Sequence, residues 1–408
     1  MLDFDEALEK IVRHTKRLPV EKKSIGKSLG RVLATDIKTR EPIPRFDSSS
    51  VDGFAVRIED LKDGSKENSV RLPIQSTRQA GSSRPISLKA GHTIKVMTGA
   101  LLPKNTQAIV MKEVVSVAGG IAGFTLPAKE GESLRRRGEE FSKGEIVLPR
   151  GTIITPPVVG MLATLGVTVV KLYRVPRIAL IVTGNEVRSP SGSLRRGEIR
   201  DSNSYALAAA LKAVGIPPIL VLHVRDNRHQ LSKAFARALK TADVVISAGG
   251  VSVGDFDFVK DVLGDLRVRT IFWRVAMKPG KPNYFGTRGR RLVFGLPGNP
   301  VSALVSLEML VMPSVRKMMG VHLSDILNSR ATLASDIRKV GGRIEFVRAI
   351  ASRSSNGHLT VRPVEKQGSH MVGGLATANC LIIFPKDLES INAGEEVVIR
   401  MLSWNQQQ

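Results

Sequence analysis

The sequence predicts a multidomain protein of mixed α/β and β structure, with a central three-layer α/β/α domain whose sheet is mostly parallel. Two observations favour this class. Between residues 177 and 318, short buried-type strands alternate with amphipathic helices, which is typical of a parallel sheet covered on both faces. β-rich segments flank this region, and a chain of 408 residues exceeds what one hydrophobic core usually holds. About two to four domains are therefore expected.

The chain begins with a helix and continues into a small, mostly β domain. Residues 3–17 place apolar side chains on one face at helical spacing, namely Phe4, Ala7, Leu8, Ile11 and Val12. The proline- and serine-rich segment 41–50 forms a rigid, polar boundary. Beyond it, short apolar runs lie between glycine, proline and serine clusters. This pattern predicts strands at 70–74, 92–97, 108–112 and 123–127.

The alternating pattern starts after residue 176, and a helix and a strand within 158–170 lead into it. Strands are expected at 177–182, 219–224, 243–247 and 291–295. Helices are expected at 205–214, 228–240, 257–263 and 300–318. After residue 326 the pattern predicts a small barrel or sandwich, with strands at 332–337, 344–351, 358–363, 380–384 and 395–401.

The charge balance favours an anionic partner. Lysine and arginine number 61 against 37 acidic residues, a formal net charge of +24. The densest basic segment, 267–291, contains eight lysine and arginine side chains and no acidic one. Aromatic residues make up only 4%, and no nucleic-acid-binding module is recognisable. A phosphorylated small molecule is therefore favoured over nucleic acid, although the motifs do not explain the whole charge excess.

Cysteine content and hydropathy indicate the compartment. The single cysteine, Cys380, excludes an intramolecular disulfide and a thiolate metal site, which fits a reducing environment. The acidic, polar N-terminus does not resemble a signal peptide. The longest apolar stretches, 158–170 and 301–313, are shorter than the ~18 residues of a membrane span. A cytoplasmic protein without membrane contact is expected.

Unusual residues follow the predicted strands of the central domain, where ligands bind in sheets of this kind. They occupy 183–186, 199–204, 248–257 and 296–302. In the third stretch, Gly249, Gly250 and Gly254 expose backbone amides to phosphate, and Asp255 and Asp257 offer oxygen ligands for magnesium. Each stretch has a structural alternative. Asp201 to Asn203 could only cap a helix, Glu186 could be a first-turn acid, and Asp226 could be a solvated loop residue.

The stretch 296–302 has the clearest mechanism. Asn299 is a good N-cap residue, Pro300 suits the first helical position, and Gly298 lets a ligand approach the backbone. The amides at such a helix start bind anions. A plain strand-to-helix turn is the alternative.

The β domain contains three irregular stretches. They lie at 44–55, 96–103 and 135–140. Asp52-Gly53 could be only a turn, and the run from Arg135 to Glu140 could be only a solvated charge run.

In order, these stretches resemble the MoeA family, which includes the E domain of gephyrin. The motifs occupy 46–53, 97–100, 135–140, 183–186, 200–203, 249–254, 278–282, 296–302 and 367–369. The resemblance implies four domains: an elongated one from 1–45 and 145–175, an inserted β domain at 46–144, an α/β molybdopterin-binding domain at 176–325 and a C-terminal β-barrel at 326–408. It also implies a homodimer in which the α/β domain of one chain faces the β domain of the other.

The resemblance implies a molybdopterin molybdenumtransferase. Its substrates would be molybdate and adenylylated molybdopterin, and its products would be the molybdenum cofactor and AMP. It would use Mg²⁺ or a similar divalent cation. The adenylyltransferase that prepares molybdopterin shares the α/β module and is both an alternative reading and a candidate partner. The segments of Asp52 and Thr98 favour the molybdenumtransferase, because adenylylating relatives usually consist of the α/β domain alone. A scaffold is the remaining alternative, but no second module or long linker supports it.

The family's functional positions are carried over residue by residue. The implied catalytic residues are Asp52, Thr98, Glu186, Asp226, Asp257 and Lys278. The substrate-binding residues are Gly249, Gly250, Ser252, Gly254, Lys281, Pro297, Gly298, Asn299, Pro300, Ser302, Arg348 and Ser369. The candidate metal ligands are Glu186, Asp226 and Asp257, and the sequence leaves open which of them holds the ion. Lys278 and Lys281 suit molybdate or the pterin phosphate, and tungstate is nearly isosteric with molybdate.

Three positions depart from the family pattern. Glu140 stands where the family has aspartate, Arg274 where it has lysine, and Asn185 where aspartate is common. Arginine keeps the positive charge of lysine but changes its geometry. The roles of Glu140 and Arg274 therefore stay open.

Overall fold

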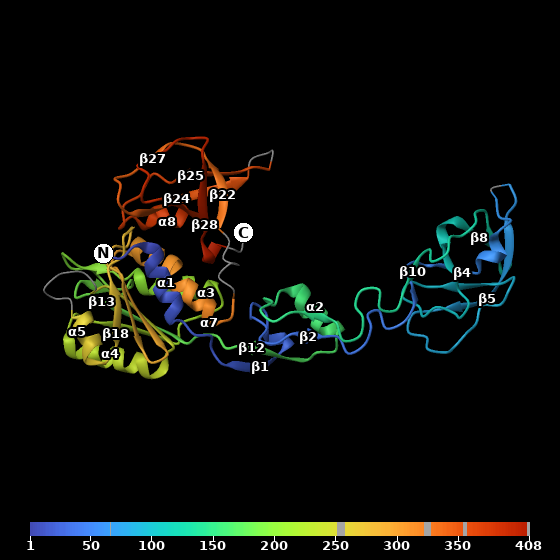
Figure 1. The fold of residues 1–408 in the computed structure, drawn as a ribbon, viewed down its shortest axis with the longest axis horizontal. Helices are drawn as coiled ribbons and strands as arrows, with labels where there is room; N and C mark the ends of the chain where they lie inside the picture. Colours follow the sequence, from blue (N-terminus) through green and yellow to red (C-terminus); the bar gives the residue numbers. More distant parts are fainter. Residues whose placement is uncertain (66, 251–257, 322–327, 354–356, 406–408) are drawn as a thin grey trace. The chain divides into compact units, whose positions relative to one another are not determined.

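The computed structural model describes residues 1–65, 67–250, 258–321, 328–353 and 357–405 (Figure 1). These residues form two compact units, each with its own hydrophobic core. The first unit contains residues 1–35, 151–163 and 167–408, and the second contains residues 36–150 and 164–166.

A six-stranded sheet forms the centre of the first unit. In sheet order its strands are β16 (Leu220–Val224), β13 (Ile178–Thr183), β17 (Val244–Ala248), β21 (Arg291–Leu296), β20 (Tyr284–Arg288) and β18 (Arg269–Trp273). The first four are parallel, whereas β20 and β18 add an antiparallel edge. The predicted mostly parallel sheet is confirmed, but the sequence did not predict the two edge strands.

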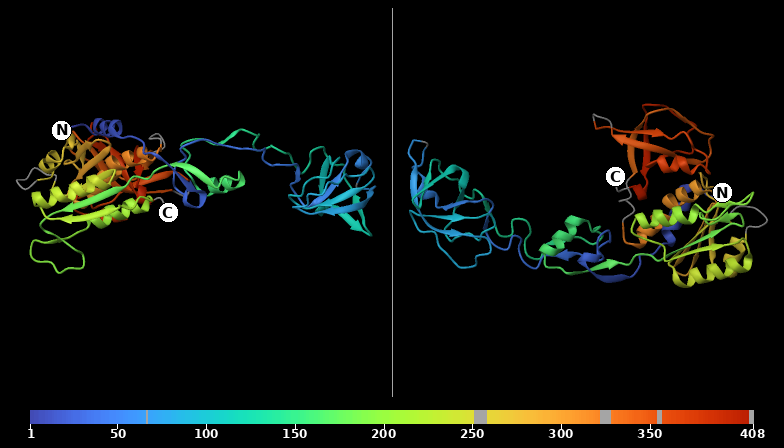
Figure 2. Two further views of the ribbon diagram at one scale, coloured as in Figure 1. Left: turned by 90° about the horizontal axis from the view of Figure 1, so that it is seen from below. Right: turned by 180° about the vertical axis from the view of Figure 1, so that it is seen from behind.

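Helices cover both faces of this sheet (Figures 1 and 2). On one face lie α4 (Arg228–Thr241) and α5 (Val259–Asp265). On the other face lie α1 (Phe4–His14), α3 (Asn203–Ala213), α6 (Pro300–Ser306) and α7 (Met312–Met318). Alternation along β13 explains the three layers, because Leu180 packs in the core under α3 whereas Ile181 packs in the core under α4.

A π turn, η4 (Leu307–Val311), joins α6 to α7 within the predicted helix 300–318. Glu308 in this turn is fully buried. Its carboxylate accepts hydrogen bonds from the backbone nitrogen and hydroxyl of Ser403, at 3.2 and 2.8 Å. The apolar stretch 301–313 is therefore core, and no helix in the described part of the chain is long and apolar enough to cross a membrane.

A small antiparallel ribbon also belongs to the first unit. Strand β1 (Val20–Ser24) pairs with β12 (Val169–Tyr173), and α2 (Pro156–Thr164) precedes β12. The helix and strand expected within 158–170 are therefore present. The 3₁₀ turn η1 (Ile25–Lys27) and the short strands β14 (Val187–Arg188), β15 (Ile199–Arg200) and β19 (Met277–Lys278) also belong to the first unit.

The C-terminal region forms a closed five-stranded barrel, seen in orange and red in Figure 1. Its strands are β22 (Asn328–Leu333), β24 (Ile344–Arg353), β25 (Leu359–Pro363), β26 (Cys380–Phe384) and β28 (Glu396–Met401). The pairing of β24 with β26 closes the sheet on itself. The short elements here are β23 (Ile337–Arg338), α8 (Val372–Thr377), β27 (Ser390–Ile391) and η6 (Ser403–Asn405). The barrel is confirmed.

The second unit is built on a six-stranded sheet of its own. In order the strands are β7 (Ala108–Met111), β4 (Gly53–Val56), β6 (Thr93–Val96), β5 (Val70–Arg78), β9 (Ile121–Phe124) and β8 (Val115–Ala118). Two further pairs join β3 (Ser48–Ser49) to β10 (Leu134–Arg135) and β2 (Ile37–Lys38) to β11 (Ile146–Leu148). The turns η2 (Ile58–Leu61) and η3 (Lys112–Val114) lie between strands. The expected β domain is therefore present.

Candidate active site

A crevice of about 650 Å³ lies at the carboxyl ends of β13, β17 and β21. This is the position where open α/β sheets bind ligands, because the loops that follow parallel strands meet there. The sequence-predicted residues that line it are Glu186, Asp226, Gly249, Gly250, Pro297, Gly298, Asn299 and Pro300. The structure therefore brings the four unusual stretches together.

Asp226 is held by the loop after β13. Its carboxylate accepts a hydrogen bond from the Thr183 hydroxyl at 2.5 Å and another from the backbone nitrogen of Asn185 at 3.2 Å. The Asn185 side-chain oxygen in turn accepts from the backbone nitrogen of Asp226 at 3.1 Å. Asp226 is thus a fixed wall residue and not a freely solvated loop acid. An aspartate at position 185 could make the same acceptor contact.

The glycines after β17 allow two loops to approach closely. Gly249 has φ +93°, and a Cβ atom there would lie 2.4 Å from the carbonyl oxygen of Thr183. At Gly250, with φ +64°, a Cβ atom would lie 2.9 Å from Val259. Only glycine fits these positions without displacing the Thr183 loop. Ser252, Gly254 and Asp257 lie outside the described residues.

The start of α6 opens onto the crevice. Asn299 occupies the N-cap position and Pro300 the first helical position, as expected. However, the Asn299 side chain makes no capping bond and donates to the Ser369 hydroxyl at 3.0 Å. The first amides of the helix are therefore not capped by Asn299, which keeps them accessible to an anion.

Asp201 and Asn203 have different roles. Asp201 is buried, and its carboxylate accepts from the backbone nitrogen and hydroxyl of Ser204 and lies 3.0 Å from His223 Nδ1. Asp201 therefore caps α3, which is the structural role that the sequence offered as the alternative to ligand binding. Asn203 donates to the carbonyl of Gly298 at 2.7 Å, whereas its own side-chain oxygen is buried without a hydrogen-bond partner. That oxygen is a candidate acceptor for a ligand in the crevice.

Carboxylates in the crevice suit a hydrated divalent ion. Glu186 and Asp226 both line it, and the Glu186 carboxylate has no hydrogen-bond partner among the residues described. No group of three histidine, cysteine, aspartate or glutamate side chains is arranged for a metal within the described ranges. Magnesium commonly retains several waters and uses one or two carboxylates together with substrate phosphate. The donor set present fits that mode.

A side cavity of about 450 Å³ adjoins the crevice, and Pro282, Pro297 and Asn299 line both. Its sequence-predicted lining residues are Lys278, Lys281, Pro297, Asn299, Ser302 and Ser369. The Lys278 ammonium lies 3.1 Å from the carboxylate of Glu345, which also lines the cavity and which sequence reasoning missed. Lys278 and Glu186 therefore line two adjoining cavities and not the same one.

Arg348 lies behind the wall of the side cavity. It is fully buried and donates to the carbonyl of Lys366 at 2.9 Å, while its backbone and the Gln367 amide exchange hydrogen bonds. Burial lowers the pKa of its guanidinium. Two of its nitrogens, Nε and Nη1, have no hydrogen-bond partner. Arg348 thus supports the segment that carries Ser369.

Asp52 and Thr98 meet in the second unit. The backbone nitrogen and hydroxyl of Thr98 both donate to Asp52 at 2.8 Å, and the Lys112 ammonium lies 3.1 Å from the other carboxylate oxygen. These contacts, above all the backbone bond from Thr98, lower the pKa of Asp52 from 3.8 to about 2. We call these three residues the Asp52 cluster. The pairing shows more than a turn at Asp52, and no sequence motif pointed to Lys112.

Replacing Lys112 by methionine should raise the pKa of Asp52, because the carboxylate loses one hydrogen bond and a nearby positive charge. The value should stay below 3.8, because both Thr98 bonds remain. Since the folded pKa is depressed, this group favours folding above pH ~4, and the contribution is lost as pH falls towards 2. An NMR titration of the carboxyl carbon checks the shift. Lys104→Met, on another exposed lysine of this unit, should leave it unchanged.

Arg274 and Glu140, the two positions whose roles the sequence leaves open, have different surroundings. Arg274 has φ +84° and places its guanidinium 5.4 Å from the centre of the Trp273 ring. The backbone nitrogen of Glu140 donates to the carbonyl of Ile43 at 3.0 Å. Arg274 therefore stacks on a neighbour, and for Glu140 only the backbone contact is defined.

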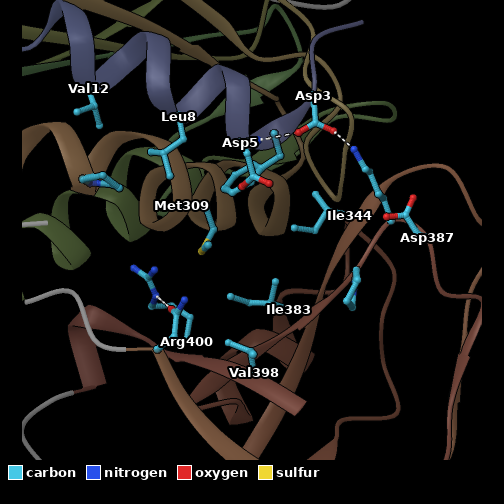
Figure 3. Close-up of a pocket in the computed structure, with 15 residues that line it drawn as sticks. Asp3, Asp5, Leu8, Val12, Met309, Ile344, Ile383, Asp387, Val398 and Arg400 are labelled. Carbon is cyan, nitrogen blue, oxygen red and sulfur yellow. Dashed lines mark hydrogen bonds and ion pairs between the residues drawn. The ribbon is translucent and has the colours of Figure 1, made fainter. Parts of the chain in front are cut away.

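Another cavity, of about 520 Å³, lies between α1, η4 and the barrel (Figure 3). Its floor is apolar, with Leu8, Met309 and Ile383 pointing into it, and Lys386 and Asp3 pair across its rim at 2.9 Å. None of the sequence-predicted site residues lines it. Its chemistry does not suit a phosphorylated substrate, so the crevice is the better candidate.

Three family models match the chain in order. They describe the MoeA N-terminal region (domains I and II) at residues 2–166, a probable molybdopterin-binding domain at 179–317 and the MoeA C-terminal region (domain IV) at 330–402. The chain is 34% identical to a molybdopterin molybdenumtransferase of Haemophilus influenzae, with 98% of each chain covered. It is 32% identical to one from Staphylococcus aureus, over 97% of this chain and 94% of the relative.

Solved structures give the same result. The chain is similar to a molybdopterin biosynthesis MoeA protein from Pyrococcus horikoshii, with a TM-score of 0.83 and 30% sequence identity. That match covers 98% of this chain and 100% of the other. The likeness therefore extends over almost the whole of both chains.

Proposed function

The chain belongs to the MoeA family, and on that premise we propose that it inserts molybdenum from molybdate into adenylylated molybdopterin with release of AMP. It is an enzyme of molybdenum cofactor biosynthesis. The observation that carries the detailed reaction is the pair of adjoining spaces. The crevice is lined by carboxylate side chains and by the start of α6, and the side cavity is lined by two lysines.

The crevice supports binding of the substrate's phosphate groups. The amides at the start of α6 and after β17 face it, and the close approach of Gly249 to Thr183 leaves no side chain in the way. The buried oxygen of Asn203 can accept a hydrogen bond from the substrate, which would satisfy its missing partner. These groups would orient the phosphoanhydride that is cleaved when AMP leaves.

Glu186 and Asp226 would hold a divalent ion such as Mg²⁺, directly or through water. When bound, this ion supplies positive charge against the phosphate oxygens. Asp226 is fixed by Thr183 and Asn185, so it suits a positioning role, whereas Glu186 has a carboxylate available for the ion. Asp257 remains a third proposed ligand.

The side cavity would bind the oxyanion. Lys278 and Lys281 supply positive charge, and Ser302 and Ser369 supply hydroxyl donors around the same space. Glu345 neutralises part of the Lys278 charge in the absence of a ligand. Arg348 would act indirectly, because it holds the segment that positions Ser369. Tungstate has nearly the same size and charge, so it is expected to enter the same space.

The alternative, a molybdopterin adenylyltransferase, is not favoured. Matches to both the MoeA N-terminal and C-terminal regions flank the shared α/β module. The adenylyltransferase is instead proposed as a partner that supplies the substrate. We place the reaction in the cytoplasm, because the one cysteine is buried and unpaired, as suits a reducing compartment.

The function is tested by incubating the pure protein with adenylylated molybdopterin, magnesium and either molybdate or tungstate. AMP release that depends on both the oxyanion and the divalent ion is the expected result. Transfer of AMP to free molybdopterin from ATP, without oxyanion dependence, would instead identify an adenylyltransferase.

We further propose a homodimer in which the Asp52 cluster of one chain completes the crevice of its partner. The cluster holds a partly exposed, ionised carboxylate that lines none of the three cavities described above. A permanent interface should bury more than ~2,000 Å² in total. Light scattering at micromolar protein should give twice the mass of one chain. A fully active monomer would contradict the shared site.

A further inference from the structure

The structure indicates a second site for an anion, at the amino-terminal ends of the central strands and opposite the crevice. The basic segment 267–291 divides between two places: Lys278 and Lys281 line the side cavity, whereas Arg290 and Arg291 line a separate cavity of about 200 Å³. We call this second space the basic cavity. Its charged lining residues are Lys16, Arg17, Arg174, Arg290, Arg291 and Asp243.

Backbone hydrogen bonds between distant segments build this cavity. The nitrogen of Leu18 donates to the carbonyl of Met318 at 2.9 Å, and the nitrogen of Arg174 donates to the carbonyl of Pro19 at 2.9 Å. On the sheet side, the nitrogen of Leu292 donates to the carbonyl of Asp243 at 3.0 Å. The basic side chains therefore converge on a preformed frame, and little ordering is required when a ligand binds.

Among the described residues that line the cavity, the one carboxylate, Asp243, is already neutralised. Asp243 accepts two hydrogen bonds from the Arg174 guanidinium, both at 2.8 Å, and a third from the backbone nitrogen of Arg177. Although burial raises the pKa of Asp243, these hydrogen bonds outweigh it and the net pKa is lowered, so the group stays ionised. Glu21, the other carboxylate that acts on Arg174, is bonded to Arg31 at 2.6 Å.

Four cations of the basic cavity have no acidic partner among the residues described: Lys16, Arg17, Arg290 and Arg291. Arg17 lies against the Tyr173 ring, with its guanidinium 5.9 Å from the ring centre, which holds it beside the cavity. The Nε atom of Arg291 is buried and has no hydrogen-bond partner. Leaving such a donor unpaired is costly, so a bound acceptor would stabilise the arrangement.

The basic cavity is separate from the crevice. It lies where β21 begins, at Arg291, and beside Asp243, which precedes β17. The crevice lies where these strands end, at Pro297 and Gly249. Since β21 has six residues and a strand rises about 3.3 Å per residue, the two sites are roughly 20 Å apart.

We propose that the basic cavity binds a phosphate dianion, either free or as the end group of a phosphate monoester. Guanidinium groups match phosphate oxygens in paired hydrogen bonds, and four unpaired cations exceed the charge of one dianion. The volume suits a compact anion. A nucleic acid is disfavoured, because specific complexes use an extended surface of about 1,000 Å² or more.

The test is calorimetric titration at low ionic strength with two probes, inorganic phosphate and methyl phosphate, a monoester that is not a product of the proposed reaction. The double variant Arg17→Gln and Arg290→Gln removes two exposed cations without touching the sheet core, so folding should survive. Binding should weaken by about tenfold or more, which is the loss expected for a charge-assisted contact. Arg291→Gln should weaken binding by a similar factor. Arg237→Gln, an exposed arginine on α4, is the matched control and should bind normally.

Loss of binding in the double variant but not in the control supports the site, and the probe that binds identifies free phosphate or the monoester as the source. Absence of binding by both probes overturns the proposal. Binding that survives in the double variant and in Arg291→Gln also overturns it, because the anion must then lie elsewhere. Raising the salt concentration to physiological levels should weaken the interaction in the unaltered protein, since it is electrostatic.

Discussion

Replacing Glu186 by glutamine is expected to reduce AMP release by at least ~100-fold, comparable to the loss of one preorganised electrostatic group. Glutamine has nearly the same shape as glutamate but cannot neutralise a cation. The Glu186 side chain is exposed in the crevice and no core contact depends on it, so the thermal unfolding midpoint should stay unchanged. The measurement is AMP release as a function of magnesium and molybdate, and the loss should be greatest in the dependence on magnesium.

Asp261→Asn is the matched control for that experiment. Asp261 is an exposed acid on α5, away from the crevice lining, and its replacement should leave turnover unchanged. If Glu186→Gln remains folded and retains near-normal turnover, the crevice is not the active site. A loss shared equally by both variants would point to the overall charge of the domain instead.

Replacing Lys278 by alanine is expected to raise the molybdate concentration needed for half-maximal AMP release by roughly 10- to 100-fold. A hydrogen bond to a charged group contributes about 1.5–3 kcal/mol, which corresponds to that range. A compact oxyanion relies on few contacts, so the loss of one ammonium should not be compensated by others. The dependence on magnesium should change little, because Lys278 lines the side cavity and Glu186 the crevice.

Glu345→Gln provides a test in the opposite direction. It removes the carboxylate that lies 3.1 Å from the Lys278 ammonium, so less molybdate should be required. Lys212→Ala, on an exposed lysine at the end of α3, should have no effect. If Lys278→Ala and Glu345→Gln shift the molybdate requirement in the same direction, the ion pair is a structural contact and Lys278 does not capture the oxyanion.

The crevice could be predicted from sequence because its position follows from a regular feature of parallel sheets. The carboxyl ends of parallel strands fall on one edge of a sheet, so the motifs after three strands had to meet there. The edge strands could not be predicted in this way. The register of β18 shifts between Thr270 and Phe272, which disturbs the alternation that identifies a strand, and the surrounding arginines obscure it further.

Contacts between distant residues account for most of what sequence reasoning missed at the site. Lys112 belongs to no motif, and its partner Asp52 lies 60 residues away. The local rule for helix starts assigned Asn299 a capping bond, but the side chain instead bonds Ser369, which lies 70 residues further along the chain. Local propensity gave the correct position for Asn299 and the wrong partner, because the contact that its side chain makes is a tertiary one.

The π turn at Leu307–Val311 has a consequence for how the gene can change. A π turn contains one residue more than the α-helical turn it replaces, and each residue of an α-helix turns the following chain by about 100°. Deleting one codon within this turn would leave a continuous helix but rotate α7 relative to α6. It would also carry Glu308 or its neighbours away from Ser403, the contact between this helix and the segment that follows the barrel. Alignments of relatives should therefore contain few single-residue gaps between Pro300 and Met318, and a relative with such a gap should also have lost the serine at the position of Ser403.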